Sequence, residues 1–250
     1  MSKKLEGKIA IVTGGSAGIG LAAAQQLVLE GAYVFITGRR QSELDAAVKT
    51  IGSNVTGIQA DSSSLSDLDK VYGQIKQQKG RVDIVFANAG GGDFAPLGAI
   101  SEEHFDRIFN TNVRGLVFTV QKALPLMPDG GAIILNASIT SIKGTGAFSV
   151  YSASKAAVRS FARSWTVDLK DRKIRVNAVS PGPIETPGLG GLAPDEQQRS
   201  GLFAHLASTV PLGRLGQPAE IGKAVAFLAS DDASFITGIE LFVDGGAAQI

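Results

Sequence analysis

A tyrosine and a lysine four positions apart form the pair in this sequence that is best suited to proton transfer. Tyr151 and Lys155 lie in the segment Tyr-Ser-Ala-Ser-Lys, and on a helix residues at this spacing project from one face, one turn apart. A free phenol has a pKa near ~10 and is a poor acid or base at neutral pH. A nearby ammonium favours the phenolate and lowers that pKa toward the range of acid/base catalysis. A Tyr/Lys pair on a protein surface can have the same spacing, so this pair needs support from elsewhere in the chain.

Three glycines follow the first apolar segment. Residues 8–13 are predicted to form a buried strand, and Gly14, Gly18 and Gly20 come next, before a helical pattern that continues to about residue 30. Such a turn lets the backbone approach a pyrophosphate, and the helix N-terminus supplies unpaired N–H groups. The G-x-x-x-G-x-G spacing differs from the commonest dinucleotide fingerprint, G-x-G-x-x-G. The turn can also serve plain chain reversal, but its place in a βαβ unit favours nucleotide binding.

Short β-branched segments alternate with longer helical patterns along the rest of the chain. This alternation is typical of βαβ units, in which helices cover both faces of a parallel sheet. We therefore predict one doubly wound α/β domain over residues 1–250, with a Rossmann-like parallel sheet of about seven strands. The later strands are predicted at 33–37, 55–59, 82–87, 132–135, 175–179 and 240–243, and the helices at 41–51, 65–79, 101–126, 150–171 and 218–229.

The composition argues against several partners and sites. Lys and Arg number 24 against 23 Asp and Glu, so charge gives no reason to expect nucleic acid or an anionic membrane as a partner. The absence of cysteine excludes disulfides and thiolate metal sites. His104 and His205 have no clustered partners, so no metal site is expected. No segment has the pattern of a signal peptide or a membrane span, and we expect a cytoplasmic protein.

The segment Thr13-Gly-Gly-Ser-Ala-Gly-Ile-Gly20 resembles the cofactor turn of the short-chain dehydrogenase/reductase family, in its single-domain branch. Much of the chain is similar to the NADP-dependent secondary alcohol dehydrogenases and ketoreductases of that family. One departure is Ala87, which replaces the first asparagine of the family's Asn-Asn-Ala-Gly motif, a mainly structural position. The other family motifs follow in order along nearly the whole chain: Asn88-Ala89-Gly90, Thr111-Asn112-Val-Arg-Gly115, Ser138 thirteen residues before Tyr151, Tyr151 with Lys155, Pro181-Gly182 with Thr186, and Val243-Asp-Gly-Gly246.

The resemblance implies a catalytic role for four residues. Tyr151 would protonate a carbonyl oxygen during reduction and accept the proton when an alcohol is oxidised. Lys155 would lower the pKa of the tyrosine and hold the nicotinamide ribose. Ser138 would donate a hydrogen bond to the substrate oxygen, and its spacing favours it over the neighbouring serines. Asn112 would position a water between Lys155 and solvent, although it could also be an ordinary polar helix residue.

The end of the second predicted strand bears on the identity of the cofactor. NAD-binding relatives carry an acidic residue there, about 20 residues past the glycine turn. Here Gly38 leaves room, and the guanidiniums of Arg39 and Arg40 suit a 2′-phosphate, so we expect NADP (NADPH). The two arginines could instead form a solvated helix start. The full set assigned to the cofactor is Gly14, Ser16, Gly18, Ile19, Gly20, Gly38, Arg39, Arg40, Asp61, Ser62, Asn88, Ala89, Gly90, Tyr151, Lys155, Pro181, Gly182, Ile184 and Thr186.

Residues 183–211 differ in composition from the rest of the chain. They are rich in Gly and Pro at first and then weakly helical. In the family this region closes the substrate pocket, and such a composition suits a mobile lid. No Arg or Lys is obviously committed to an anionic substrate, so we expect a mostly apolar ketone or secondary alcohol. Candidates for the pocket lining, each of which could also be core, are Ile139, Thr140, Phe148, Leu189, Leu192, Phe203 and Leu206.

The expected function is hydride transfer between NADP(H) and a ketone or secondary alcohol. Small residues on the helix that carries Tyr151 permit close packing, and the resemblance implies a homotetramer. Two other functions share the fold: a non-catalytic regulator that senses the cofactor, and a lyase or epimerase. The complete set of Asn112, Ser138, Tyr151 and Lys155 argues against a regulator. The short lid, with no added substrate domain, argues against sugar-nucleotide chemistry.

Overall fold

The computed structural model describes residues 3–249, which form a sheet of seven parallel strands in the order β3-β2-β1-β4-β5-β6-β7. The strand order therefore reverses between β1 and β4. In open sheets of this kind, ligands bind outside the carboxyl ends of the strands at such a reversal. Each predicted strand is confirmed: β1 Ile9–Val12, β2 Tyr33–Gly38, β3 Val55–Gln59, β4 Ile84–Ala87, β5 Ala132–Asn136, β6 Arg175–Pro181 and β7 Glu240–Val243.

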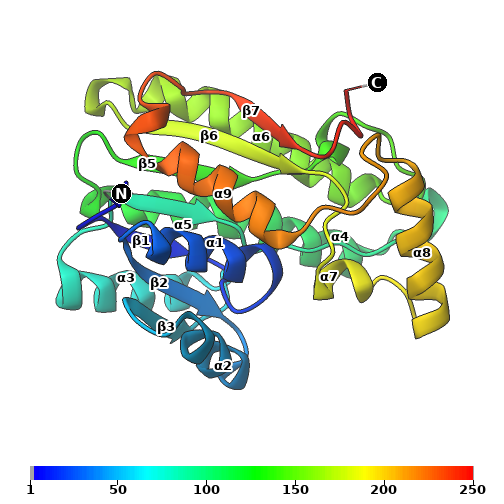
Figure 1. The fold of residues 1–250 in the computed structure, drawn as a ribbon, viewed down its shortest axis with the longest axis horizontal. Helices are drawn as coiled ribbons and strands as arrows, with labels where there is room; N and C mark the ends of the chain where they lie inside the picture. The colour runs from blue at the N-terminus through cyan, green and yellow to red at the C-terminus, as the bar shows by residue number, and fades with distance from the viewer. Residues whose placement is uncertain (1–2, 250) are drawn as a thin grey trace.

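Helices cover both faces of this sheet (Figure 1). One face carries α1 (Gly18–Leu29), α2 (Gln41–Ile51) and α9 (Pro218–Ala229). The other face carries α3 (Leu65–Lys79), α5 (Leu116–Ala123) and α6 (Ser149–Asp168). The helix predicted at 101–126 consists of α4 (Glu102–Phe109), a π-helical segment (Asn110–Gly115), α5 and a short 3₁₀ turn. The doubly wound Rossmann-like fold is confirmed.

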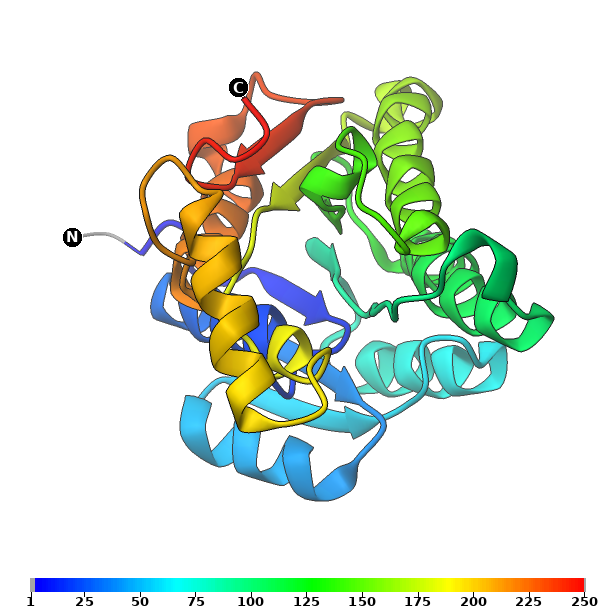
Figure 2. The same ribbon diagram turned by 90° about the vertical axis from the view of Figure 1, so that its right-hand side faces the viewer.

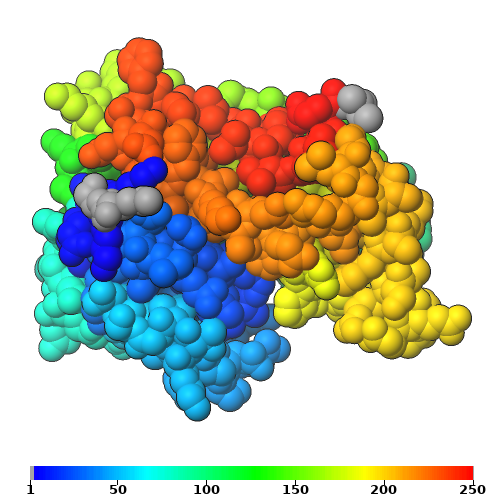
Figure 3. Space-filling model, viewed as in Figure 1, coloured from blue at the N-terminus to red at the C-terminus, as the bar shows by residue number. Residues whose placement is uncertain are grey.

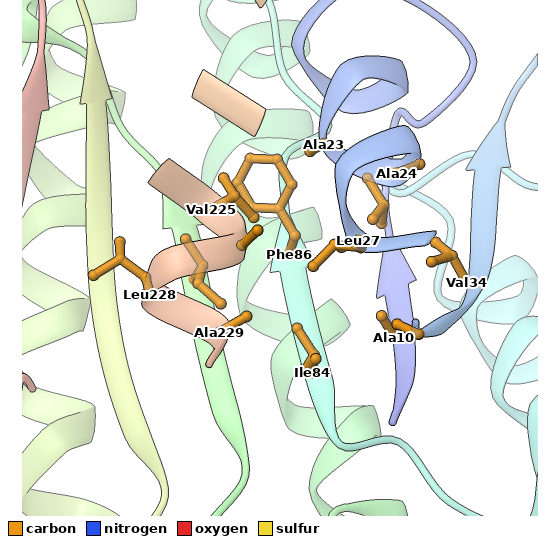
Figure 4. Close-up of a cluster of buried hydrophobic side chains, with 14 of the residues drawn as sticks. Ala10, Ala23, Ala24, Leu27, Val34, Ile84, Phe86, Val225, Leu228 and Ala229 are labelled. Atoms are coloured by element: carbon orange, nitrogen blue, oxygen red, sulfur yellow. The ribbon is translucent and has the colours of Figure 1, made fainter. Parts of the chain in front are cut away.

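An apolar cluster lies between each helical layer and the sheet. Successive strand residues alternate between the two clusters, because side chains on a strand point to opposite faces. Figure 4 shows Phe86 of β4 between Leu27 of α1 and Val225 of α9. The two helices pack closely at Gly222, where an added Cβ would stand 2.7 Å from the carbonyl oxygen of Ala22. This packing gives the glycine turn at the start of α1 a rigid support.

The segment of α7 (Pro187–Gly190) and α8 (Glu196–Ser208) lies apart from these layers, at the carboxyl ends of the strands (Figure 2). No residue of α8, all of which the structure describes, is buried. In the space-filling view a notch separates this segment, in yellow, from the N-terminal part of the chain, in blue (Figure 3). Within residues 3–249, no helix has the length and apolar character needed to cross a membrane.

Candidate active site

Tyr151 and Lys155 lie on α6, as their spacing predicts. Nζ of Lys155 stands 5.5 Å from the centre of the Tyr151 ring. The lysine is only 3% exposed, and its Nζ donates a 2.7 Å hydrogen bond to the carbonyl oxygen of Asn136, the last residue of β5. Burial lowers the pKa of Lys155 to about 8, so the side chain is mostly protonated at neutral pH and loses its charge in mildly alkaline solution.

The Tyr151 phenol differs from the sequence-based prediction. Burial raises its pKa, and the hydrogen bond with Ser138 offsets only part of that rise. The predicted net fall of this pKa is therefore wrong for the structure, whereas stabilisation of the phenolate by the charged Lys155 stays a prediction. The physical reason is that the apolar surroundings disfavour the phenolate, while the ammonium of Lys155 is directed at a backbone carbonyl.

Ser138 begins a short turn after β5, which we call the serine turn (residues 138–141). Its Oγ accepts a 3.2 Å hydrogen bond from the Thr140 N–H and lies 3.1 Å from the Thr140 hydroxyl. The Ser141 N–H closes the turn on the Ser138 carbonyl at 2.9 Å. Ser138 is buried and forms a hydrogen bond with Tyr151. The structure thus brings the two predicted groups together, whereas the hydroxyl of neighbouring Ser154 donates to the Tyr151 backbone carbonyl.

Asn112 is buried in the π-helical segment between α4 and α5. Its Oδ1 accepts the Gly91 N–H at 3.0 Å, and its Nδ2 donates to the Gly91 carbonyl at 2.9 Å and to the Ser154 hydroxyl at 3.0 Å. The side chain therefore fixes the loop after β4 against α6. Single π-helical turns are frequent at functional sites, and this one turns the amide toward both elements. The predicted role of Asn112 with a water remains a prediction.

A polar network connects the glycine turn to Lys155, and it includes two residues that the site prediction missed. The Thr13 hydroxyl accepts the backbone N–H groups of Asn88 and Ala89, each at 3.0 Å. The Asn88 amide donates to the Thr13 carbonyl at 2.8 Å, and Asn136 donates to Asn88 Oδ1 at 2.9 Å. A signal for Asn136 exists in the sequence, because it is the polar end of an otherwise apolar strand, Ala-Ile-Ile-Leu-Asn.

The glycine turn forms a cradle that fits a dinucleotide pyrophosphate. Gly14 and Gly18 have φ values of +64° and +53°, which glycine adopts without strain. At Gly20 an added Cβ would lie 2.1 Å from the Gly14 carbonyl oxygen, so the start of α1 can contact the turn only without a side chain. Among the described residues, no side chain caps the N-terminal N–H groups of α1. These groups therefore stay available to an anion.

The predicted 2′-phosphate site lies at the end of β2. Arg39 and Arg40 are exposed, and the Arg39 carbonyl accepts a 2.8 Å hydrogen bond from the Gln59 side chain. Gly38 contacts the glycine turn, because a Cβ there would stand 3.0 Å from the Ser16 hydroxyl. Polar side chains thus surround the position where NAD-binding relatives carry a carboxylate: those of Ser16, Arg39, Arg40 and Gln59.

The predicted adenine contacts, Asp61 and Ser62, follow β3. Oδ1 of Asp61 accepts hydrogen bonds from the N–H and the hydroxyl of Ser63, at 2.8 and 2.7 Å. Ser62 is buried. Its carbonyl oxygen lies so close to Gly115 that a Cβ there would come within 2.6 Å. One oxygen of the Asp61 carboxylate is therefore held by Ser63, and within residues 3–249 the other oxygen accepts no hydrogen bond.

The residues predicted after β6 adjoin both the glycine turn and the C-terminal motif. At Gly182 an added Cβ would stand 2.7 Å from Cα of Asp244. At Gly18 it would stand 3.3 Å from the Thr186 methyl group, so the start of α1 and the loop after β6 lie against each other. Ile184 forms a β-bridge with Gly216, so residues 185–215 are closed at their base. The predicted lining residues on this segment are all partly exposed: Leu189, Leu192, Phe203 and Leu206.

Aromatic rings extend from the phenol to the surface. The Phe148 ring lies 4.5 Å from the Tyr151 ring, and the Phe94 ring lies 4.7 Å from Phe148, measured between ring centres. Phe94 is 47% exposed. Gly92 lies against the phenol, since a Cβ there would come within 2.5 Å of the Tyr151 ring. The sequence predicted Phe148 as a lining residue but missed Gly92 and Phe94, which follow the Asn88-Ala89-Gly90 motif.

Comparisons with known proteins agree with this geometry. The family model described as enoyl-(acyl carrier protein) reductase matches residues 14–248. Oxidoreductase asL5 of Sarocladium schorii is 48% identical and the match covers 99% of this chain and 98% of that protein. Trihydroxynaphthalene reductase of Colletotrichum orbiculare is 37% identical over 99% of this chain and 92% of its own length. A solved short-chain type dehydrogenase/reductase from Mycobacterium marinum superimposes with a TM-score of 0.91 at 33% identity, covering 98% of this chain and 97% of that one.

Proposed function

Because the chain belongs to the short-chain dehydrogenase/reductase family, we propose that this oxidoreductase reduces a ketone to a secondary alcohol with NADPH. The observation that carries the proposal is the meeting of Ser138, Tyr151 and Lys155 at the carboxyl ends of the strands, beside the glycine cradle. Each group has a chemical use in carbonyl reduction. A protein that only sensed the cofactor would have no use for a buried acid/base.

Bound NADPH would supply the hydride, and the side chains of this chain would handle the carbonyl oxygen and the proton. Ser138 and Tyr151 donate hydrogen bonds to that oxygen, where negative charge develops in the transition state. Tyr151 then transfers its proton to the oxygen. The raised pKa of the phenol keeps this proton in place until charge appears on the substrate. The cationic Lys155 stabilises the phenolate that remains.

The preference for NADPH rests on the end of β2. Gly38 stands where a carboxylate would repel a phosphate, and the exposed Arg39 and Arg40 supply charged donors. The glycine cradle and the uncapped start of α1 would hold the pyrophosphate. Lys155 would hold the nicotinamide ribose, and the Asp61 carboxylate would contact the adenine.

The ketone that best fits this site carries an aromatic ring next to the carbonyl group. Phe94 and Phe148 form an apolar aromatic surface beside the phenol, and such rings stack on other aromatic groups at centre separations of about 4.5–7 Å. The name trihydroxynaphthalene reductase, given to a relative, names an aromatic substrate for that protein. An anionic substrate is disfavoured, because the aromatic surface offers no charge to bind it.

We also propose a homotetramer. β7 is an edge strand among residues 3–249, and Phe227 of α9 and Val167 of α6 are exposed. Such edge strands and apolar side chains suit contacts between subunits. Light scattering at several protein concentrations measures the mass, and a monomer at all of them would contradict the tetramer.

Absorbance of reduced cofactor with a panel of substrates tests the function. The panel contains an aryl ketone, an aliphatic ketone of similar size, an enoyl thioester and a ketone with an added carboxylate. We expect NADPH consumption with the first two, fastest with the aryl ketone. Consumption only with the enoyl thioester would assign reduction of a carbon–carbon double bond instead. Cofactor binding without consumption of NADPH by any compound would favour the regulator, and product formation without net consumption would favour the lyase or epimerase.

A further inference from the structure

A buried carboxylate on β7 joins the serine turn to α6. The side chain of Glu240 is 5% exposed. Its Oε1 accepts a 2.6 Å hydrogen bond from the Ser141 hydroxyl and a 2.7 Å hydrogen bond from the Ser180 hydroxyl of β6. Its Oε2 forms an ion pair with the guanidinium of Arg159 on α6. One side chain thus holds together two strands, the serine turn and a helix.

The two outer arms of this network end on the elements that carry Ser138 and Tyr151. Ser141 lies in the serine turn, and its N–H bonds to the Ser138 carbonyl. Arg159 follows Tyr151 by eight residues on α6. Burying a carboxylate is unfavourable unless charge and hydrogen bonds compensate it, and a well-packed apolar side chain often stabilises a fold as well or better. A network of this kind therefore suggests a use beyond stability.

We propose that Glu240 is a positioning residue, which sets the Ser138 hydroxyl against the Tyr151 phenol through Ser141 and Arg159. The inference rests on the proposed reduction, in which both hydroxyl groups bind one carbonyl oxygen. Reaction rates depend steeply on such geometry, and a displacement of about 1 Å can lower a rate by about 10²-fold. Loss of the network should therefore slow turnover while leaving the glycine cradle, and with it cofactor binding, intact.

Two serines provide a matched test, because each donates one hydroxyl hydrogen bond to the same carboxylate oxygen at nearly the same length. Only Ser141 belongs to the serine turn. Ser141→Ala should lower kcat for ketone reduction about tenfold with an unchanged Kd for NADPH, whereas Ser180→Ala should stay within about twofold of the unmodified enzyme. Thermal unfolding of both variants measures their stability, and Ser141→Thr, which keeps a hydroxyl, should recover most of the lost kcat.

A second readout does not depend on turnover. The hydrogen bond with Ser138 lowers the pKa of the phenol. A displaced serine turn should therefore raise the pKa at which Tyr151 becomes a tyrosinate, both in Ser141→Ala and in Glu240→Gln. Absorbance titration, with Tyr151→Phe as the blank, measures this shift without any substrate. If no ketone is reduced by the unmodified protein, the proposed function fails, and the titration still decides the positioning role.

Equal kcat values in the Ser141→Ala and Ser180→Ala variants, together with an unchanged Tyr151 titration, would overturn the proposal and leave Glu240 a purely structural residue. If Glu240→Gln does not fold, the comparison of Ser141→Ala with Ser180→Ala decides the proposal. A fall in kcat confined to Ser141→Ala, together with a raised pKa of Tyr151 in that variant, would support the positioning role.

Discussion

The serine turn and α6 on one side of the candidate site differ from α7 and α8 on the other in how their side chains are held. Ser138 and Lys155 are buried; Ser138 forms a hydrogen bond with Tyr151 of α6, and Lys155 donates one to the carbonyl oxygen of Asn136 at the end of β5. The α7–α8 segment is joined to the fold at its base by the bridge between Ile184 and Gly216, and α8 contributes no buried residue. The proposed catalytic groups are thus held in place by the core, and we expect the α7–α8 segment to tolerate substitution with little effect on stability.

The largest expected effect is a loss of turnover when Tyr151 of α6 is substituted. Tyr151→Phe removes the proton donor and should lower kcat by about 10²-fold or more while NADPH binding is retained, since general acid catalysis contributes about 10²–10⁴-fold. Tyr33→Phe is the matched control, because its hydroxyl contacts Thr56 on β3, away from the site. Steady-state kinetics with a ketone, together with a binding titration, measure both quantities. Turnover of Tyr151→Phe near that of the unmodified enzyme would remove the tyrosine from the mechanism.

The next effect concerns cofactor choice at the end of β2. A hydrogen bond to a charged group contributes about 1.5–3 kcal/mol, so we expect kcat/KM for NADPH to exceed that for NADH by about tenfold or more at low salt, narrowing as salt screens the charges. Arg39→Ala with Arg40→Ala should remove most of this preference, and adding Gly38→Asp should reverse it. Lys49→Ala, on the far end of α2, is the control for an exposed positive charge. Equal efficiency with both cofactors in the unmodified enzyme would make the two arginines solvated bystanders.

The pH dependence of reduction should follow Lys155. Its pKa is lowered to about 8, so the ammonium is present below that pH and is lost above it. The Tyr151 pKa is raised, so the phenol keeps its proton over the same range. We therefore expect kcat/KM for the ketone to fall as pH rises through about 8, because the cation that stabilises the phenolate disappears. A profile that stays flat to about pH 10 would contradict a need for the charged lysine.

The smallest effect on stability should come from the α7–α8 segment. Leu192→Ala should change the ranking of ketones by a few-fold with little change in the unfolding free energy. Leu27→Ala, in the α1 core, is the matched substitution and should destabilise the fold by about 2–5 kcal/mol. Chemical denaturation measures both variants. If Leu192→Ala lowered the unfolding free energy by a similar amount, the α7–α8 segment would contribute to stability as the core does. The proposed difference between the two sides of the site would then be wrong.

Hydrogen exchange sharpens the same comparison without any substitution. Residues 185–215 should exchange faster than α6 in the free enzyme and become protected when NADPH and a ketone bind, as a closing segment requires. Equal exchange with and without ligands would make the segment a static wall of the site.

The local pattern of the sequence determined much of this protein. Alternating β-branched and helical segments predicted the seven strands and their helices, because strand and helix periodicities are local properties. The four-residue spacing placed Tyr151 and Lys155 on one face of α6 for the same reason. The glycines of the first turn predicted a close backbone approach, since only their missing side chains permit it.

Tertiary structure alone decided which distant groups meet. Ser141 and Glu240 are 99 positions apart and become neighbours only through the order of strands in the sheet. Asn136 meets Lys155 because β5 ends beside α6. The pKa of Tyr151 also depends on the fold, because burial, which no spacing of residues expresses, outweighs the hydrogen bond from Ser138. Contacts and solvation between distant segments are the properties that a local sequence pattern does not contain.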